Sequence, residues 1–208
     1  MAKVKICGIT NLEDAVLAVD LGADALGFNF YRGSSRYLSP AAARMIIDEL
    51  PSRIKNVGVF VGAGHDEIMA ARDVSRIDAI QLHGREGAFF VKGLAERTDA
   101  EIIYAFPASA DLDSSIIASY GVRSVLLDSF ENGQFGGSGR PFNWKLAASL
   151  TGIIDTLYLA GGLVPENVSE AVAHVRPEYV DVATGVEARK GKKDPNKLEA
   201  FIRNAKYA

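Results

Sequence analysis

The stretch "VKICGITNLEDAVLAVDLG", residues 4–22, contains the pattern that decides the fold. Apolar and polar residues alternate over 4–7, which predicts a short strand, and Gly8 ends that strand. Apolar residues at helical spacing follow over 11–21, and Gly22 supplies a stop signal. The stretch therefore predicts one strand followed by one helix.

The same strand and helix unit recurs along the whole chain. The predicted strands cover 4–7, 25–30, 56–61, 79–83, 101–106, 124–129, 156–161 and 179–184. The helices expected after them cover 11–22, 39–50, a segment from about Asp66, one from about Glu86, 111–120, one from about Asn143, 165–175 and 194–208. This alternation predicts an α/β protein, a single-domain (β/α)8 barrel of the TIM type over residues 1–208. A doubly wound sheet is the alternative, but eight repeats would make it large for this length.

Composition excludes several classes of partner. The 208 residues include 23 basic and 26 acidic side chains, so no basic surface for nucleic acid is expected. No apolar run approaches the roughly 18 residues of a membrane span, and no membrane partner is expected. The single cysteine cannot form an internal disulfide, and no Cys or His spacing suggests a metal site. A reducing, cytoplasmic location is therefore predicted.

Two strand ends carry residues that can transfer protons, Cys7 and Asp128. In (β/α)8 barrels, catalytic side chains lie at the C-terminal ends of the strands. The strand period of two places Lys5 and Cys7 inside the barrel, with Val4 and Ile6 toward the helices. A nearby ammonium group favours the thiolate, which predicts a pKa of Cys7 below its usual value of about 8.5. The alternative is a buried thiol that packs as a small apolar residue.

The same period places Asp128 and Leu126 inside the barrel, with Val125 and Leu127 outside. A carboxyl group at a barrel mouth that is partly removed from water holds its proton more firmly, so it can act as a general acid. A residue that only caps a turn is the alternative interpretation of Asp128. The glycine-rich segment at 131–144 follows directly and predicts either a lid that closes over substrate or a disordered loop.

The loops after the seventh and eighth strands predict an anion site. Gly161 and Gly162 allow a ligand to approach the backbone closely, and Pro165 is expected to start a helix. Thr184 and Gly185 lie where a short helix could begin. Backbone N–H groups from both loops would converge on a phosphate, at the place where such barrels commonly bind one.

The loop after the second strand carries two arginines, Arg32 and Arg36. Both are expected either to be solvated or to form a guanidinium fork for a substrate carboxylate.

Taken together, these motifs resemble the phosphoribosylanthranilate isomerase family. "KICGIT", "ALGFNFYRGSSRYLSP", "VGVFV", "QLHG", "LLDS", "AGGLVPENV" and "DVATGVE" occur in the order of that family and cover nearly the whole chain. The resemblance implies an isomerase of tryptophan biosynthesis, which converts N-(5′-phosphoribosyl)anthranilate into an open-chain 1-deoxyribulose phosphate by an Amadori rearrangement. It also implies that neither a metal nor an organic cofactor is needed.

The resemblance implies roles for three residues. Cys7 would be the general base, Asp128 the general acid, and Arg36 the contact for the anthranilate carboxylate. The family often has Ser-Ser-Gly where this chain has Ala183, Thr184 and Gly185. That departure leaves the backbone donors of the loop but removes a side-chain hydroxyl at position 183.

Further substrate-binding residues are expected deeper in the barrel mouth. Gln81 and His83 come from the "QLHG" motif, and Asp181 points inward from the last strand. Asp181 would either hydrogen-bond the sugar or neutralise Lys5, and the sequence leaves both roles open. The expected partner is a small phosphorylated substrate, and the chain is expected to be a monomer or a homodimer.

Two other functions are compatible with this fold. Indole-glycerol-phosphate synthase is a sibling barrel, but its chemistry is associated with lysine and glutamate at strand ends, where this chain has Cys7 and Asp128. A non-catalytic phosphosugar-binding barrel would keep the anion loops and make the cysteine and aspartate incidental.

Overall fold

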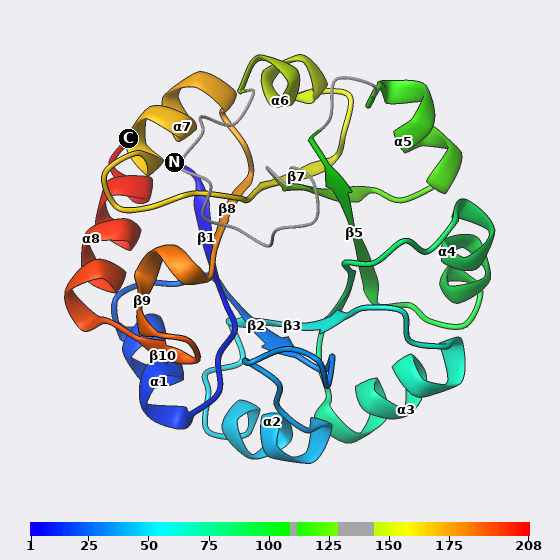
Figure 1. Cartoon of the computed structure of the whole chain (residues 1–208), viewed down its shortest axis with the longest axis horizontal. Coiled ribbons are helices and arrows are strands. Elements are labelled where there is room, and N and C mark those ends of the chain that lie inside the picture. The colour runs from blue at the N-terminus through cyan, green and yellow to red at the C-terminus, as the bar shows by residue number, and fades with distance from the viewer. Residues whose placement is uncertain (109–111, 129–143) are drawn as a thin grey trace.

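The computed structural model describes residues 1–108, 112–128 and 144–208. Its strands form one closed barrel, and the helices surround it as an outer ring (Figure 1). Every strand of the barrel is parallel to its neighbours, and β1 pairs with β8 to close the circle. The predicted (β/α)8 barrel is therefore confirmed.

The element bounds follow the predicted alternation closely. The barrel strands are β1 Lys3–Cys7, β2 Ala25–Asn29, β3 Lys55–Phe60, β4 Ala79–Leu82, β5 Glu101–Pro107, β6 Ser124–Asp128, β7 Thr156–Leu159 and β8 Tyr179–Val182. The helices are α1 Leu12–Asp20, α2 Pro40–Ile47, α3 His65–Ser75, α4 Ala88–Ala95, α5 Ser114–Tyr120, α6 Trp144–Leu150, α7 Val168–Val175 and α8 Pro195–Lys206. None of the helices in these described ranges is long and apolar enough to cross a membrane.

A short insertion lies between β8 and α8; the sequence predicted the short helix that begins at Thr184 but not the hairpin that follows it. The insertion consists of the 3-10 helix η1, Thr184–Val186, and an antiparallel hairpin of β9, Glu187–Arg189, and β10, Lys192–Lys193. The hairpin lies beside α1 on the outside of the barrel (Figure 1). Thr10 fastens it there, because its hydroxyl donates a hydrogen bond of 2.5 Å to the carbonyl of Gly191.

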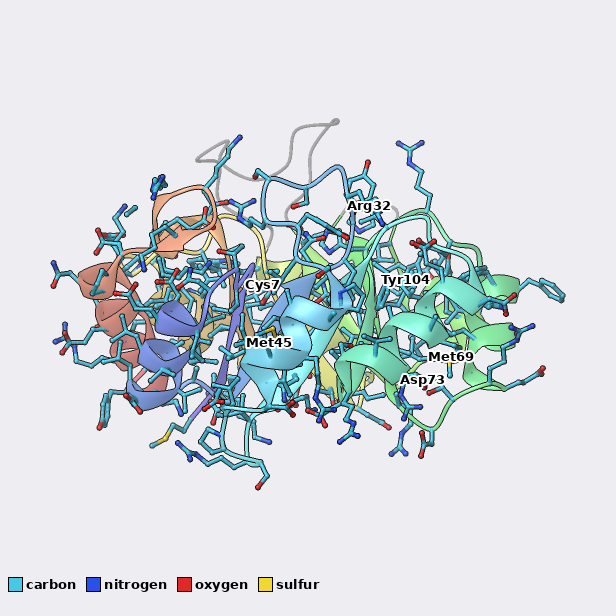
Figure 2. All side chains as sticks on the ribbon, turned by 90° about the horizontal axis from the view of Figure 1, so that it is seen from below. Cys7, Arg32, Met45, Met69, Asp73 and Tyr104 are labelled. Carbon is cyan, nitrogen blue, oxygen red and sulfur yellow. The ribbon has the colours of Figure 1, made fainter. Side chains whose placement is uncertain are left out.

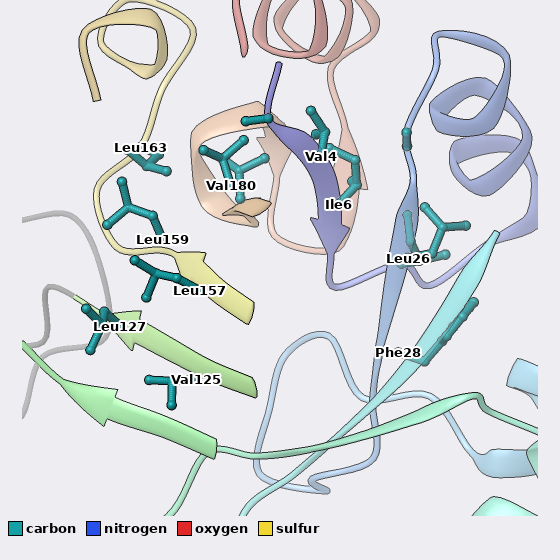
Figure 3. Packing of buried hydrophobic residues seen from close by; sticks show 14 of the residues in the cluster. Val4, Ile6, Leu26, Phe28, Val125, Leu127, Leu157, Leu159, Leu163 and Val180 are labelled. Atoms are coloured by element: carbon teal, nitrogen blue, oxygen red, sulfur yellow. The ribbon is translucent and has the colours of Figure 1, made fainter. Parts of the chain in front are cut away.

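Alternating side chains of each strand pack in two separate layers. Val4 and Ile6 are fully buried in the layer between strands and helices, together with Val125 and Leu127 (Figure 3). Leu126 belongs instead to the smaller cluster that fills the barrel interior. The predicted facing of β1 and β6 is therefore confirmed, and it directs Lys5, Cys7 and Asp128 inward.

Polar and aromatic side chains fill the end of the barrel where the strands begin. Glu101 Oε2 lies 2.6 Å from Lys55 Nζ, and its Oε1 accepts a 2.6 Å hydrogen bond from Ser124. Beside them, Tyr158 stacks on Tyr179 with 4.4 Å between ring centroids. This packing closes one end, so a ligand can enter only from the opposite end, where the strands terminate.

Figure 2 shows the two ends from the side. Arg32, in the loop after β2, lies toward one end, and Asp73, near the close of α3, lies toward the other. The loops that follow the strands, including the one that carries Arg32, therefore border the open end of the barrel.

Three helices begin later than the sequence predicted, and one of them is α5, which starts at Ser114 after its N-cap Asp113. Helix α4 starts at Ala88 because Glu86 turns back and accepts hydrogen bonds from the N–H groups of Gly62 and Gly84. Helix α7 starts at Val168, so Pro165 does not begin it and lies in a turn before it.

Candidate active site

Cys7 ends β1 at the open end of the barrel, and it is partly exposed there. Gly27 on the neighbouring β2 provides the space for its thiol. A Cβ atom added at Gly27 would lie 2.8 Å from Cys7 Sγ and 3.2 Å from Lys5 Nζ. Sequence reasoning missed Gly27, although a glycine inside a strand is a known signal of close approach by another group.

Lys5 and Asp181 form a buried ion pair behind the thiol. Lys5 Nζ lies 2.8 Å from Asp181 Oδ1, and the lysine side chain has no exposed surface. Burial lowers the pKa of Lys5, but the charges of Asp181 and Cys7 outweigh it, and the net pKa is raised. Asp181 thus neutralises Lys5, one of the two roles left open for it, and a hydrogen bond from Asp181 to the sugar stays a prediction.

The predicted low pKa of Cys7 is wrong. Loss of contact with water is the largest influence and raises the pKa of the thiol. Lys5 lowers that pKa, as the sequence suggested, but the carboxylate of Asp181 opposes it. The prediction considered the positive charge of Lys5 but not the negative charge of Asp181, which pairs with it and weakens its effect on the thiol.

Asp128 ends β6 and contacts His83, which directly follows β4, so the contact crosses over β5. His83 Nε2 lies 3.3 Å from Asp128 Oδ2, and both side chains are about a fifth exposed, at 23% and 22%. On the other side of the ring, Nδ1 lies 3.0 Å from the amide nitrogen of Gln81. An amide that donates to Nδ1 leaves the ring proton on Nε2, where it faces the carboxyl group.

Gln81 is buried in the barrel interior, with 1% of its surface exposed. The structure thus joins Gln81 and His83, which come from one motif, to Asp128 in a single chain of contacts. This chain fixes the direction of the carboxyl group at the mouth of the barrel.

Arg36 forms an ion pair with Glu187 at the mouth of the barrel, and the sequence did not reveal this partner. Its Nε and Nη2 donate hydrogen bonds of 2.7 and 2.6 Å to the two carboxylate oxygens of Glu187, and Nη2 also lies 3.0 Å from the hydroxyl of Thr184. Gly8 makes room for this arginine, because a Cβ there would lie 2.5 Å from Arg36 Cδ. Glu187 and Thr184 therefore occupy the Nε and Nη2 side of the guanidinium, and a contact between Arg36 and a substrate carboxylate stays a prediction.

The loops after β7 and β8 meet each other as predicted. Gly161 and Gly162 have φ angles of 81° and 66°, in the region that favours glycine. A Cβ at Gly185 would lie 2.0 Å from the carbonyl oxygen of Leu163, so only glycine allows the two loops to touch. Asn167, another residue not predicted, holds the first loop through bonds of 3.0 Å to Gly162 O and 2.9 Å from the Val164 N–H.

Two further sequence predictions concern the segment 131–144 and Arg32. The predicted lid at 131–144 lies outside the described residues, apart from Trp144. Arg32 is exposed and lies over the ring of Tyr37, with 5.6 Å from its guanidinium carbon to the ring centroid. In the described part of the chain, no three His, Cys, Asp or Glu side chains are grouped so that they could hold a metal ion.

Residues 4–204 match the family model described as N-(5′-phosphoribosyl)anthranilate (PRA) isomerase. Relatives of that name from Citrifermentans bemidjiense and Thermotoga maritima are each 45% identical over 206 residues. The alignments cover 99% of this chain, with 98% and 99% of the respective relatives.

Solved structures agree with the sequence comparison. The crystal structure of phosphoribosyl anthranilate isomerase from Thermotoga maritima superposes with a TM-score of 0.92, at 44% identity and with full coverage of both chains. A second structure of this enzyme holds reduced 1-(o-carboxyphenylamino)-1-deoxyribulose 5-phosphate, and its TM-score is 0.88 at 42% identity, again with full coverage of both chains.

Proposed function

Because the chain belongs to the N-(5′-phosphoribosyl)anthranilate isomerase family, we propose that it converts N-(5′-phosphoribosyl)anthranilate to 1-(2-carboxyphenylamino)-1-deoxyribulose 5-phosphate in tryptophan biosynthesis. In this proposal Cys7 is the general base and Asp128 the general acid. The observation that carries it is their placement. Cys7 ends β1 and Asp128 ends β6, and both side chains face inward at the open end of the barrel. A related enzyme binds the reduced form of this product.

The first step is opening of the furanose ring. Asp128 donates its proton to the ring oxygen, the bond between that oxygen and C1′ breaks, and the electron pair of the anthranilate nitrogen forms a Schiff base with C1′. The contact with His83, 3.3 Å away, supports this role because it directs the carboxyl group toward the mouth. Positioned proton transfer of this kind contributes typically about 10²–10⁴-fold to a rate.

The second step moves a proton from carbon. The Schiff base makes the C2′ hydrogen acidic, and the thiolate of Cys7 removes it, which gives an enolamine. Return of a proton to C1′ and loss of the C2′ hydroxyl proton yield the ketone. Acid and base act on opposite ends of the same bond system, and β1 and β6 lie on different sides of the barrel.

Binding energy comes from the two ends of the substrate. The carboxylate of the anthranilate ring meets the guanidinium of Arg36, which Glu187 holds in place. The phosphate meets backbone N–H groups at Gly162 and Gly185, where the two loops touch. Glycine at these positions lets the anion reach the backbone.

We also propose cytoplasm as the compartment and a monomer or homodimer as the assembly. A reducing compartment suits a mechanism that depends on a free thiol. A solved structure of monomers generated from the dimeric enzyme of Thermotoga maritima is 41% identical to this chain, with a TM-score of 0.86 and full coverage of both chains. Sedimentation of the purified protein distinguishes the two assemblies.

The test of the function is turnover of the substrate. The purified chain is mixed with freshly prepared N-(5′-phosphoribosyl)anthranilate, and the loss of anthranilate-type fluorescence is followed together with the appearance of the ketose product. The proposal expects loss of fluorescence at a rate proportional to protein. Binding of the substrate without conversion would instead support a non-catalytic phosphosugar-binding barrel, and closure of an indole ring from the ketose would support a synthase.

A further inference from the structure

Lys193, on β10, reaches the active site from outside the barrel. Its side chain has no exposed surface, and its Nζ donates hydrogen bonds of 2.6 Å to the carbonyl of Cys7 and 3.1 Å to the carbonyl of Ala183. Glu187 Oε1 lies 3.6 Å from the same nitrogen. Neither the sequence analysis nor the proposed mechanism uses this lysine.

The two hydrogen bonds of Lys193 lie where the pairing between β1 and β8 ends. The ladder between β1 and β8 ends with the pair Ile6 and Val182; Cys7, the last residue of β1, and Ala183, which follows β8, are the next residues along the chain. Their carbonyl groups are therefore beyond the last described strand pair, and Lys193 joins them through one ammonium group. A buried lysine is costly unless it is paired and hydrogen-bonded, so this site is built around the lysine.

We propose that Lys193 is a positioning residue, which fixes the backbone of Cys7 and thereby the place of its thiol. The inference rests on the proposed function in one respect, namely that Cys7 is the base. Lys193 touches the carbonyl of Cys7 and contacts no reacting atom, so it acts on the base through the backbone of Cys7. The bond to Ala183 ties the same point to the start of η1 in the anion loop.

Four charged groups surround the thiol of Cys7. Lys5 comes from β1, Asp181 from β8, Lys193 from β10 and Arg36 from the loop after β2. Burial raises the pKa of the thiol, and Lys5 and Lys193 lower it, while Asp181 raises it.

The pKa of Lys193 is shifted as well. Burial lowers the pKa of Lys193, and Glu187 opposes that effect. Removing the Lys193 amine while leaving the other charges in place should therefore move the pKa of Cys7 upward.

The experiment compares Lys193→Met with Lys192→Met in the full chain. Lys192 is the matched control because it is the adjacent lysine, but it pairs at 2.7 and 2.8 Å with Glu13 and Asp14 on α1. Cys7 is the chain's only cysteine, so the rate of iodoacetamide alkylation against pH reports its ionisation directly.

For Lys193→Met we expect the midpoint of that profile to rise by roughly one pH unit, the effect of losing a neighbouring cation. We also expect kcat to fall at least about 10-fold, because small displacements of a reacting group are costly. Lys192→Met should match wild type in both. A midpoint and kcat unchanged in Lys193→Met would overturn the proposal.

A second variant separates position from charge. Lys193→Arg keeps a cation, so its alkylation midpoint should stay near that of wild type, while its larger head displaces the Cys7 carbonyl and lowers kcat. If Lys193→Met does not fold, Lys193→Arg carries the test, and a wild-type kcat there would contradict the positioning role. Failure of the wild type to turn over substrate would instead refute the proposed function, because the alkylation profiles do not depend on turnover.

Discussion

Replacing Gly27 with alanine tests whether the thiol of Cys7 needs the space beside it. The added Cβ would lie 2.8 Å from Cys7 Sγ and 3.1 Å from Cys7 Cα. Non-bonded heavy atoms normally stay about 3.5 Å or more apart, so the thiol or its strand must move by about 0.7 Å, which approaches the roughly 1 Å misplacement that is costly in catalysis. A displacement of that size can cost about 10²-fold in rate.

We therefore expect Gly27→Ala to lower kcat at least about 10²-fold, which equals about 2.7 kcal/mol of activation free energy. The free energy of unfolding should fall by only about 1–3 kcal/mol, the usual cost of overpacking a core. Gly64→Ala is the control, because a Cβ at Gly64, in the loop before α3, meets no atom within 4 Å.

The assay is steady-state fluorescence of the substrate, with circular dichroism to measure the folded fraction of each variant. The reasoning predicts a large loss of kcat in Gly27→Ala and near wild-type kinetics in Gly64→Ala. A folded Gly27→Ala protein with wild-type kcat would refute the claim that the thiol works from the position seen here.

Three other predictions concern the acid and the carboxylate contact. Asp128→Asn should keep binding of a product analogue, measured by calorimetry, and nearly abolish turnover, because an amide cannot donate the required proton; activity within a few-fold of wild type would contradict this. Arg36→Met should weaken binding of the substrate by about 1.5–3 kcal/mol more than binding of an aniline analogue without the carboxylate. Equal losses for the two ligands would contradict a contact between Arg36 and the carboxylate. Burial raises the pKa of Glu187, but Arg36 and Lys193 together outweigh it and the net pKa is lowered, so these contacts stabilise the fold above the ordinary pKa of about 4.5 and lose this effect as the pH falls below it. The Tm difference between wild type and Glu187→Gln should therefore shrink from pH 6 toward pH 3, and a constant difference would contradict it.

The barrel could be predicted from sequence because its determinants are local. Alternation within each strand and helical spacing after it are visible in windows of a few residues, and the alternation also placed Lys5 and Cys7 on the inner face correctly. Cys7 and Asp128 could be singled out because residues at strand ends of such barrels meet at one rim.

The supporting residues could not be predicted because their partners are distant in sequence. Lys193 and Cys7 are 186 positions apart, and Arg36 and Glu187 are 151 apart. The motif "DVATGVE" includes Glu187, but the sequence does not show that its partner is Arg36. The pKa of Cys7 was misjudged for the same reason, since Asp181 comes from the other end of the chain.

The most direct test of the mechanism is kcat of Cys7→Ser. The substitution exchanges one atom and keeps the shape of the side chain, but the serine hydroxyl does not ionise near neutral pH, whereas a thiol does so in part. The mechanism predicts a loss of at least about 10²-fold in kcat with little change in KM, measured on protein shown to be folded. Wild type should also lose activity on alkylation and be protected by a phosphorylated substrate analogue. A Cys7→Ser protein with near wild-type kcat would contradict the account and leave the thiol as a packing residue.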